Sequence, residues 1–123
     1  MMPYCEFIIH NLYLRSEANN NDHWSKKHKR KIKNNFFIKA ALHTTFSEKE
    51  KKLPCKIVLT RIGKRLLDED NLVHAFKGIR DSIADFLIPG LKPGQADSDK
   101  RIEWEYAQEK GEYAVKIQIF ICD

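Results

Sequence analysis

The apolar pattern of this 123-residue chain predicts a single small domain of the α/β (α+β) class over residues 1–123. Four segments have the β-branched content or alternation of strands, two have the 3.6-residue period of helices, and no linker or repeat divides them. The predicted strands are 5–14, 55–62, 101–106 and 112–121, and the predicted helices are 24–46 and 71–87. Their β-α-β-α-β-β order predicts a mixed sheet of about four strands with two main helices.

The two predicted helices each show an apolar stripe. In 71–87 the apolar residues recur at i, i+3 or i+4 and i+7, and Asp70 is the candidate N-cap. In 24–46 the predicted core face consists of Ile32, Phe36, Phe37, Ala40 and Ala41. The segment 88–99 contains two prolines and two glycines, and is therefore predicted to be a loop.

The last two predicted strands alternate strictly, and Trp104 and Tyr106 are predicted core residues of the first of them. The segment 107–111 is predicted to join the two strands as a hairpin. The strand 112–121 is apolar on both faces, which predicts burial beyond the monomer core and hence a homodimer. The alternative is that the helices cover both faces. The residues concerned are Tyr113, Val115, Ile117, Ile119 and Ile121 on one face, and Ala114 and Phe120 on the other.

Composition argues against several classes of protein. No apolar run approaches the roughly 20 residues of a membrane helix, so no membrane partner is expected. Cys5, Cys55 and Cys122 lie far apart and show no C-x-x-C spacing. This spacing argues against a disulfide framework or a structural zinc site, and favours a reducing cytoplasm.

The charge is divided unevenly along the chain. The net charge is +5, yet residues 1–66 carry 15 Lys/Arg and 5 Asp/Glu, whereas residues 67–123 carry 7 and 12. This asymmetry predicts a basic surface for a polyanion and a separate acidic centre.

The basic surface is concentrated in "KKHKRKIK" at 26–33. Lys26–Arg30, Lys27–Lys31 and Lys29–Lys33 are like-charged i,i+4 pairs, each costing a helix roughly 0.2–0.5 kcal/mol. DNA phosphates would offset this repulsion and release counterions on binding. The alternative is a solvated helix face. His23 and Trp24 precede the run and could pack or stack against DNA, although a buried Trp24 that staples the helix is an equal alternative.

The acidic centre begins with "LDEDNL" at 67–72. If this stretch is extended, Asp68 and Asp70 point the same way, and Asp97 and Asp99 in the later loop do likewise. Carboxylates on loops beside a sheet suit Mg²⁺, which takes one or two of them together with water and substrate phosphate. The alternative is a helix cap with a solvated neighbour. An EF-hand is excluded, because Val73 and Ile79 occupy its required Gly and Glu positions.

The stretches "SEANNNDHWSKKHKRKIK", "DEDNL", "ADSD" and "RIEWEYAQEKG" occur in that order between residues 15 and 111. Together they resemble the RusA family of Holliday junction resolvases in its phage and prophage form. The resemblance implies a small homodimeric crossover junction endodeoxyribonuclease, bacterial or phage-encoded and cytoplasmic. Such an enzyme nicks four-way DNA junctions symmetrically in recombination and repair. The implied cofactor is Mg²⁺ held by aspartates, with Mn²⁺ as an alternative ion.

The resemblance also implies roles for individual residues. Asp68 and Asp70 match the family's D-x-D pair, Asn71 and Leu72 complete that motif, and Asp97 matches the later acid.

This chain departs from the family pattern at two positions. Ala96 stands where the family often has an acid, and Asp99 is expected to replace it as a ligand. His74 stands at the usual lysine position, and Lys77 on the same helix face is expected to take over its electrostatic role, the alternative being a solvated lysine.

The expected site therefore contains three groups of residues. The expected catalytic residues are Asp68, Asp70, Asp97 and Lys77. The expected metal ligands are Asp68, Asp70, Asp97 and Asp99. The expected DNA-binding residues are His23, Lys26, Lys27, Lys29, Arg30, Lys31, Lys33, Asn71 and His74. The rival interpretations are a non-catalytic nucleic-acid-binding protein and a less selective metal-dependent nuclease.

Overall fold

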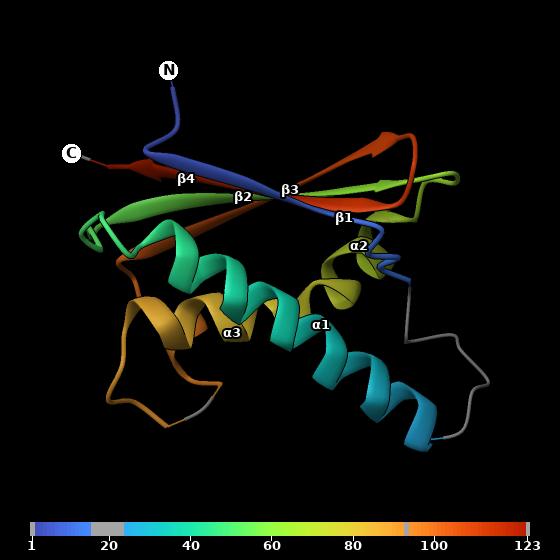
Figure 1. The fold of residues 1–123 in the computed structure, drawn as a ribbon, viewed down its shortest axis with the longest axis horizontal. Coiled ribbons are helices and arrows are strands. Elements are labelled where there is room, and N and C mark those ends of the chain that lie inside the picture. The colour runs from blue at the N-terminus through green and yellow to red at the C-terminus, as the bar shows by residue number, and fades with distance from the viewer. Residues whose placement is uncertain (1, 16–23, 93, 123) are drawn as a thin grey trace.

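The computed structural model describes residues 2–15, 24–92 and 94–122, arranged as a four-stranded mixed sheet with helices packed on it (Figure 1). The elements in chain order are β1 (Cys5–His10), α1 (Trp24–Thr45), β2 (Cys55–Gly63), α2 (Glu69–Ala75), α3 (Lys77–Leu87), the 3-10 turn η1 (Ala96–Ser98), β3 (Ile102–Lys110) and β4 (Ala114–Ile121). The predicted α+β class, mixed sheet and approximate element order are confirmed.

The strands lie side by side in the order β1-β4-β2-β3. β2 pairs with β3 in parallel and with β4 antiparallel. The predicted hairpin over 107–111 is therefore wrong, because β2 separates the two strands and 107–110 continue β3. The connection passes the end of β2, where the Gly111 N–H donates to the Gly63 carbonyl at 3.0 Å. A Cβ at Gly111 would lie 3.1 Å from Ile62 Cγ2, so a glycine eases this close passage.

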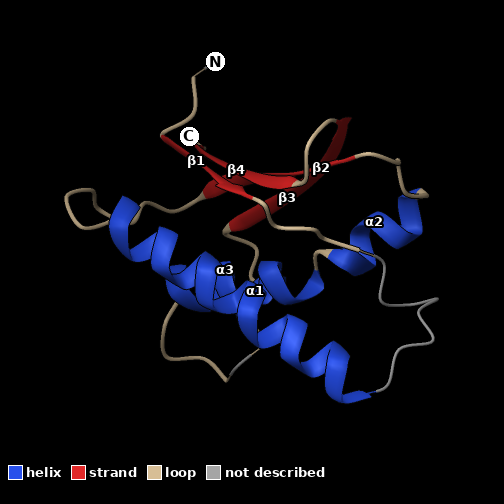
Figure 2. Cartoon of the chain, turned by 45° about the vertical axis from the view of Figure 1, so that its right-hand side comes forward, coloured by secondary structure: helices blue, strands red, loops and turns tan. Residues whose placement is uncertain are grey.

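The helices lie on one face of the sheet, as two views of the chain show (Figures 1 and 2). Alternate residues of β2 and β4 point into that layer, as the two-residue period of a strand requires. The core between sheet and helices includes the fully buried side chains Ile57, Leu59, Ile117, Ile38, Leu42, Phe76 and Ile83. On the opposite face charged pairs occur, such as Lys56–Glu105 at 3.3 Å and Lys116–Glu109 at 3.8 Å.

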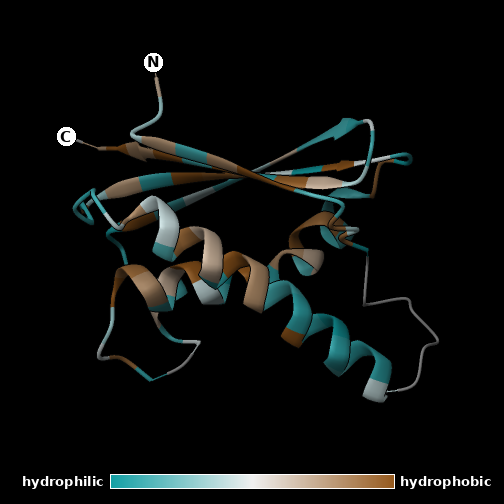
Figure 3. Ribbon diagram, in the orientation of Figure 1, coloured by the Kyte–Doolittle hydropathy of each residue, from teal (hydrophilic) through white to brown (hydrophobic). Residues whose placement is uncertain are grey.

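Helix α1 buries a different face from the one predicted. Ile38 and Leu42 are fully buried, whereas Ile32 and Phe36 are 56% and 67% exposed and Phe37 is 39% exposed. The buried face of α1 is the one that carries Ile38 and Leu42, whereas the N-terminal part of the helix projects away from the sheet (Figure 3). No helix within the described ranges is long and apolar enough to span a membrane.

The predicted helix 71–87 is divided in two at Phe76. Helix α2 begins at Glu69, so the N-cap position falls to Asp68 rather than to Asp70, and the Asp68 side chain makes no capping hydrogen bond. The Phe76 N–H is shared between the carbonyls of Leu72 and Val73 at 3.3 and 3.2 Å, which ends the α2 ladder. The Phe76 ring is fully buried, and its packing fixes the joint between α2 and α3.

Candidate active site

Four of the predicted site residues line one pocket of about 340 Å³ beside the sheet. They are Asp70, His74, Lys77 and Asp97, and the remaining lining residues are Val73, Arg80 and Tyr106. This set, called the acidic pocket below, brings together α2, α3, η1 and β3. Asp70 and His74 line it from α2, and Lys77 lines it from the start of α3, because the helix expected to carry all three is divided at Phe76.

The segment that leads into α2 is held by side chains of the sheet. Gln108 on β3 donates from Nε2 to the Leu67 carbonyl at 2.8 Å and accepts at Oε1 from the Leu67 N–H at 2.9 Å. It therefore pairs with Leu67 as a neighbouring strand would, immediately before Asp68. This contact fixes where the acidic stretch begins.

A buried arginine holds the same segment further upstream. Arg61 on β2 donates to the carbonyl of Leu14 at 2.6 Å and to that of Arg65 at 2.7 Å. Burial lowers the pKa of the Arg61 guanidinium, and these carbonyls offset part of the cost of burying it. Arg61 thus ties the end of the first described segment to the loop before α2.

Replacing Gln108 with alanine should lower the free energy of unfolding by about 1–3 kcal/mol, because it removes two hydrogen bonds and leaves the Leu67 amide group unpaired. Urea unfolding followed by circular dichroism measures this loss. The matched control is Gln118→Ala, whose exposed amide bonds only the Glu6 side chain and which should change stability by about 0.5 kcal/mol or less. Equal effects of the two changes on stability would contradict the conclusion that Gln108 holds Leu67 in place.

Arg80 and Trp104 position Asp97, and Tyr106 supports Arg80. Arg80 donates from Nη2 to the Asp97 carbonyl at 3.1 Å, and its Nε lies 3.1 Å from Asp97 Oδ2 without the alignment of a hydrogen bond. Trp104 Nε1 donates to the same carbonyl at 2.9 Å. Arg80 in turn donates to the Tyr106 hydroxyl at 2.9 Å and stacks over Trp104 at 4.9 Å. The ion pair with Arg80 holds the Asp97 carboxylate at the pocket wall.

Alternate residues of β3 therefore anchor every segment of the acidic pocket. Trp104, Tyr106 and Gln108 share one face of the strand and bond to Asp97, Arg80 and Leu67 respectively. Trp104 and Tyr106 do pack against the core, as predicted. Their polar roles and those of Arg80, Arg61 and Gln108 were missed. A sequence signal for these roles was available, because each of these side chains faces the core yet ends in a polar group that needs a hydrogen-bond partner when buried.

The structure does not bring Asp68 and Asp99 into the acidic pocket. The predicted sharing of faces assumed extended backbone, but Asp70 lies in helix α2 and Asp97 in the turn η1. Asp99 instead accepts hydrogen bonds from Arg101 Nε and Nη2, both at 3.0 Å. Those side-chain bonds, together with the Arg101 backbone N–H, lower the pKa of Asp99 to about 2. Asn71 also lies outside the lining of this pocket.

The acidic pocket offers few ligands to a metal ion. In the described part of the chain, no three His, Cys, Asp or Glu side chains are close enough to form a metal-binding group. Asp70 and Asp97 nevertheless supply two carboxylates to one pocket. That donor set fits Mg²⁺, which commonly binds one or two carboxylates and completes its shell with water and substrate phosphate.

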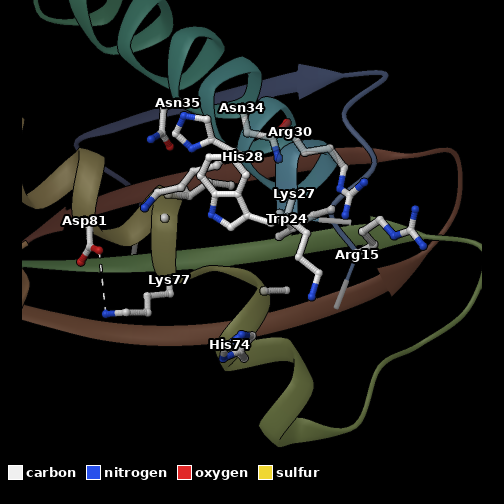
Figure 4. Close-up of a pocket in the computed structure, with 15 residues that line it drawn as sticks. Arg15, Trp24, Lys27, His28, Arg30, Asn34, Asn35, His74, Lys77 and Asp81 are labelled. Atoms are coloured by element: carbon white, nitrogen blue, oxygen red, sulfur yellow. Dashed lines mark ion pairs between the residues drawn. The ribbon is translucent and has the colours of Figure 1, made fainter. Parts of the chain in front are cut away.

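A second pocket, of about 360 Å³, lies between α1 and the α2–α3 pair (Figure 4). This α1 pocket is lined by Leu14, Arg15, Trp24, Lys27, His28, Arg30, Lys31, Asn34, Asn35, His74, Ala75, Lys77, Gly78, Ile79 and Asp81. Of the predicted DNA-binding residues it contains Lys27, Arg30, Lys31 and His74. Lys26, Lys29 and Lys33 lie on α1 outside its lining, and His23 falls outside the described residues.

The two pockets share His74 and Lys77, so a basic surface adjoins the two carboxylates. Trp24 is 72% exposed and stacks on His28 of the same helix, so the alternative of a buried Trp24 is wrong. An extended anionic chain could contact α1 and reach Asp70 and Asp97 at the same time. No protein-family model matches this chain, and neither any curated protein nor any solved structure gives a significant match.

Proposed function

We propose that the chain is a Mg²⁺-dependent, structure-specific endodeoxyribonuclease that resolves four-way DNA junctions by paired symmetric nicks, in recombination and repair. The observation that carries the proposal is that Asp70, Asp97 and Lys77 line one pocket which adjoins the basic helix α1. Such an arrangement suits phosphodiester hydrolysis on a strand held by its backbone. The sequence resemblance to RusA-type resolvases narrows the substrate to branched DNA, and a cytoplasmic setting follows from the same resemblance.

The proposed chemistry divides between the two sides of the acidic pocket. Asp70 and Asp97 would hold Mg²⁺, with Mn²⁺ as an alternative ion, and a bound ion supplies water activation and charge neutralisation at the phosphate. The Lys77 side chain is 68% exposed, and its Nζ lies 3.9 Å from Asp81 Oδ2. It can therefore turn toward a phosphate oxygen and stabilise the charge that develops there. Asp68 and Asp99 lie outside the pocket, so they could coordinate the ion only after a movement of the backbone or through a bridging water.

A gel assay of four-way junction cleavage tests the proposal and its rivals. The expected result is symmetric nicking with Mg²⁺ or Mn²⁺ and no nicking with a chelator. A linear duplex of equal length should remain uncut. Junction binding without cleavage in any divalent ion would support the non-catalytic binding protein instead. Equal cleavage of junction and duplex would support the less selective nuclease.

We further propose that the active species is a homodimer with two-fold symmetry, because one acidic pocket cannot reach both strands of a junction in one encounter. Val115, Ile117 and Ile119 are buried in the monomer, so the face of β4 that carries them belongs to the monomer core and is not available for the interface. The open face of the sheet is the remaining candidate. Ile8, which is 42% exposed, and the half-buried Phe120 lie on that face.

The dimer predicts a sedimentation-equilibrium mass of twice the 14.5 kDa chain at micromolar concentration. Ile8→Lys should shift the mass toward the monomer, because it places an unpaired charge in the interface. The matched control is Leu91→Lys, since Leu91 is a similarly exposed apolar residue in the loop after α3. A monomeric wild-type species that is fully active at that concentration would rule out the dimer and the paired-nick mechanism.

A further inference from the structure

The α1 pocket contains aromatic and hydrogen-bonding groups that backbone binding and hydrolysis do not require. We propose that it holds one unstacked nucleobase of the bound strand, with preference for a base that carries an exocyclic amino group. The inference rests on the proposed function for its placement beside the scissile phosphate. It adds a contact to a base, whereas the basic run alone would contact phosphates.

The stacking surface is provided by Trp24. Its ring lies parallel to that of His28, at 5.3 Å between centroids and 5° between planes, while the side chain remains 72% exposed (Figure 4). Exposed aromatic rings beside basic side chains are the usual platforms for unpaired bases, which stack on them irrespective of sequence. A base stacked here would extend the ring pair that Trp24 and His28 already form.

Two acceptor atoms in the wall of the pocket lack donors. Asn35 Oδ1 and Asp81 Oδ1 are buried, and neither has a hydrogen-bond partner in the described chain. Buried acceptors in native proteins are almost always paired, and a turn of either side chain toward the pocket would bring its acceptor to a donor of the ligand. Amino groups of adenine or cytosine supply such donors, and carboxylates and amides are the side chains that read them. Thymine has no amino group and should fit less well.

The position of the α1 pocket links it to the strand being cut. His74 and Lys77 form a common wall with the acidic pocket, so a nucleotide next to a phosphate at Asp70 and Asp97 would reach it. Leu14 and Ile79 are buried apolar residues in its lining. The volume of about 360 Å³ lies within the range of roughly 300–1,000 Å³ typical of small-molecule sites.

The test compares the affinity of short single strands of equal length by fluorescence anisotropy of an end label, without divalent ions. The probes are oligo-dA, oligo-dC, oligo-dT and an abasic strand, all with the same number of phosphates. Oligo-dA and oligo-dC should bind wild-type protein roughly 5- to 150-fold more tightly than the abasic strand, the factor expected for one stacked base. Oligo-dT should fall in between. Equal affinity for all four strands would overturn the proposal.

Variants separate the pocket from general charge. Trp24→Ala should remove most of the difference between oligo-dA and the abasic strand, while Trp24→Phe should retain it. Phe36→Ala is the control, because Phe36 is equally exposed on α1 but does not line the pocket, and it should leave the difference unchanged. Asp81→Ala should bring oligo-dA close to oligo-dT. Loss of the base preference in Phe36→Ala as well would contradict the assignment.

The junction assay distinguishes this inference from the proposed function. Base-dependent binding by a protein that cuts no junction would support base binding in the α1 pocket and refute the proposed nuclease function. Junction cleavage by a protein with equal affinity for all four strands would support the proposed nuclease function and refute base binding in the α1 pocket.

Discussion

Asp70→Asn is expected to reduce junction cleavage in Mg²⁺ by roughly 100-fold or more, the scale on which loss of a transition-state charge contact reduces turnover. The change preserves side-chain shape and removes one of the two carboxylates of the acidic pocket. Junction binding should persist or tighten, because the repulsion between that carboxylate and DNA phosphate disappears. Single-turnover cleavage and an anisotropy titration on the same protein separate the two effects.

Asp97→Asn should behave like Asp70→Asn, whereas Asp99→Asn is the matched control. Asp99 has the same chemistry two residues away and is likewise paired with an arginine, Arg101, yet it lies outside the pocket. It should therefore retain near-wild-type cleavage. If Asp99→Asn abolishes cleavage and Asp97→Asn does not, Asp99 rather than Asp97 is the later acid of the site. Near-wild-type cleavage by Asp70→Asn would refute the assignment of the acidic pocket itself.

The fold could be predicted from sequence wherever local periodicity and burial agree. Strand β2 and the apolar stripe of 71–87 are of this kind, because the apolar residues that mark them are buried. The buried face of α1 could not be predicted, since periodicity marks Ile32 and Phe36 but does not show that the core lies against the face of Ile38 and Leu42. The prediction of a hairpin between the last two strands failed for a related reason. A short connection predicts a hairpin, but here β2 occupies the position between β3 and β4.

In the candidate site too, some residues could be predicted from local sequence patterns and others depend on the fold. Asp70, His74, Lys77 and Asp97 could be found because acids and bases that follow strands and begin helices are conspicuous in sequence. Asp68 and Asp99 were assigned to the same group on the assumption of extended backbone, which the helical and 3-10 turns replace. The anchoring role of Gln108 depends on a contact across 41 residues, and no local pattern predicts such a pair.

The largest expected effect on binding comes from changing Lys27, Arg30 and Lys31 together to alanine. All three line the α1 pocket and lie in the N-terminal half of α1. If each contacts one phosphate, the slope of log K against log salt should shrink by about 3, because fewer counterions are released. The loss should be the same for junctions of different sequence, since phosphate contacts carry no sequence information. Anisotropy titrations over a range of salt concentrations measure both quantities.

The matched control for that triple variant is the replacement of Lys92, Lys100 and Lys110 by alanine. These exposed lysines line neither the acidic pocket nor the α1 pocket, and their removal changes the net charge by the same amount. A general effect of net charge would lower affinity equally in both variants, whereas local phosphate contacts would change the slope only in the first. An unchanged slope in the Lys27, Arg30 and Lys31 variant would mean that the basic run is a solvated face. DNA would then have to reach Asp70 and Asp97 by another route.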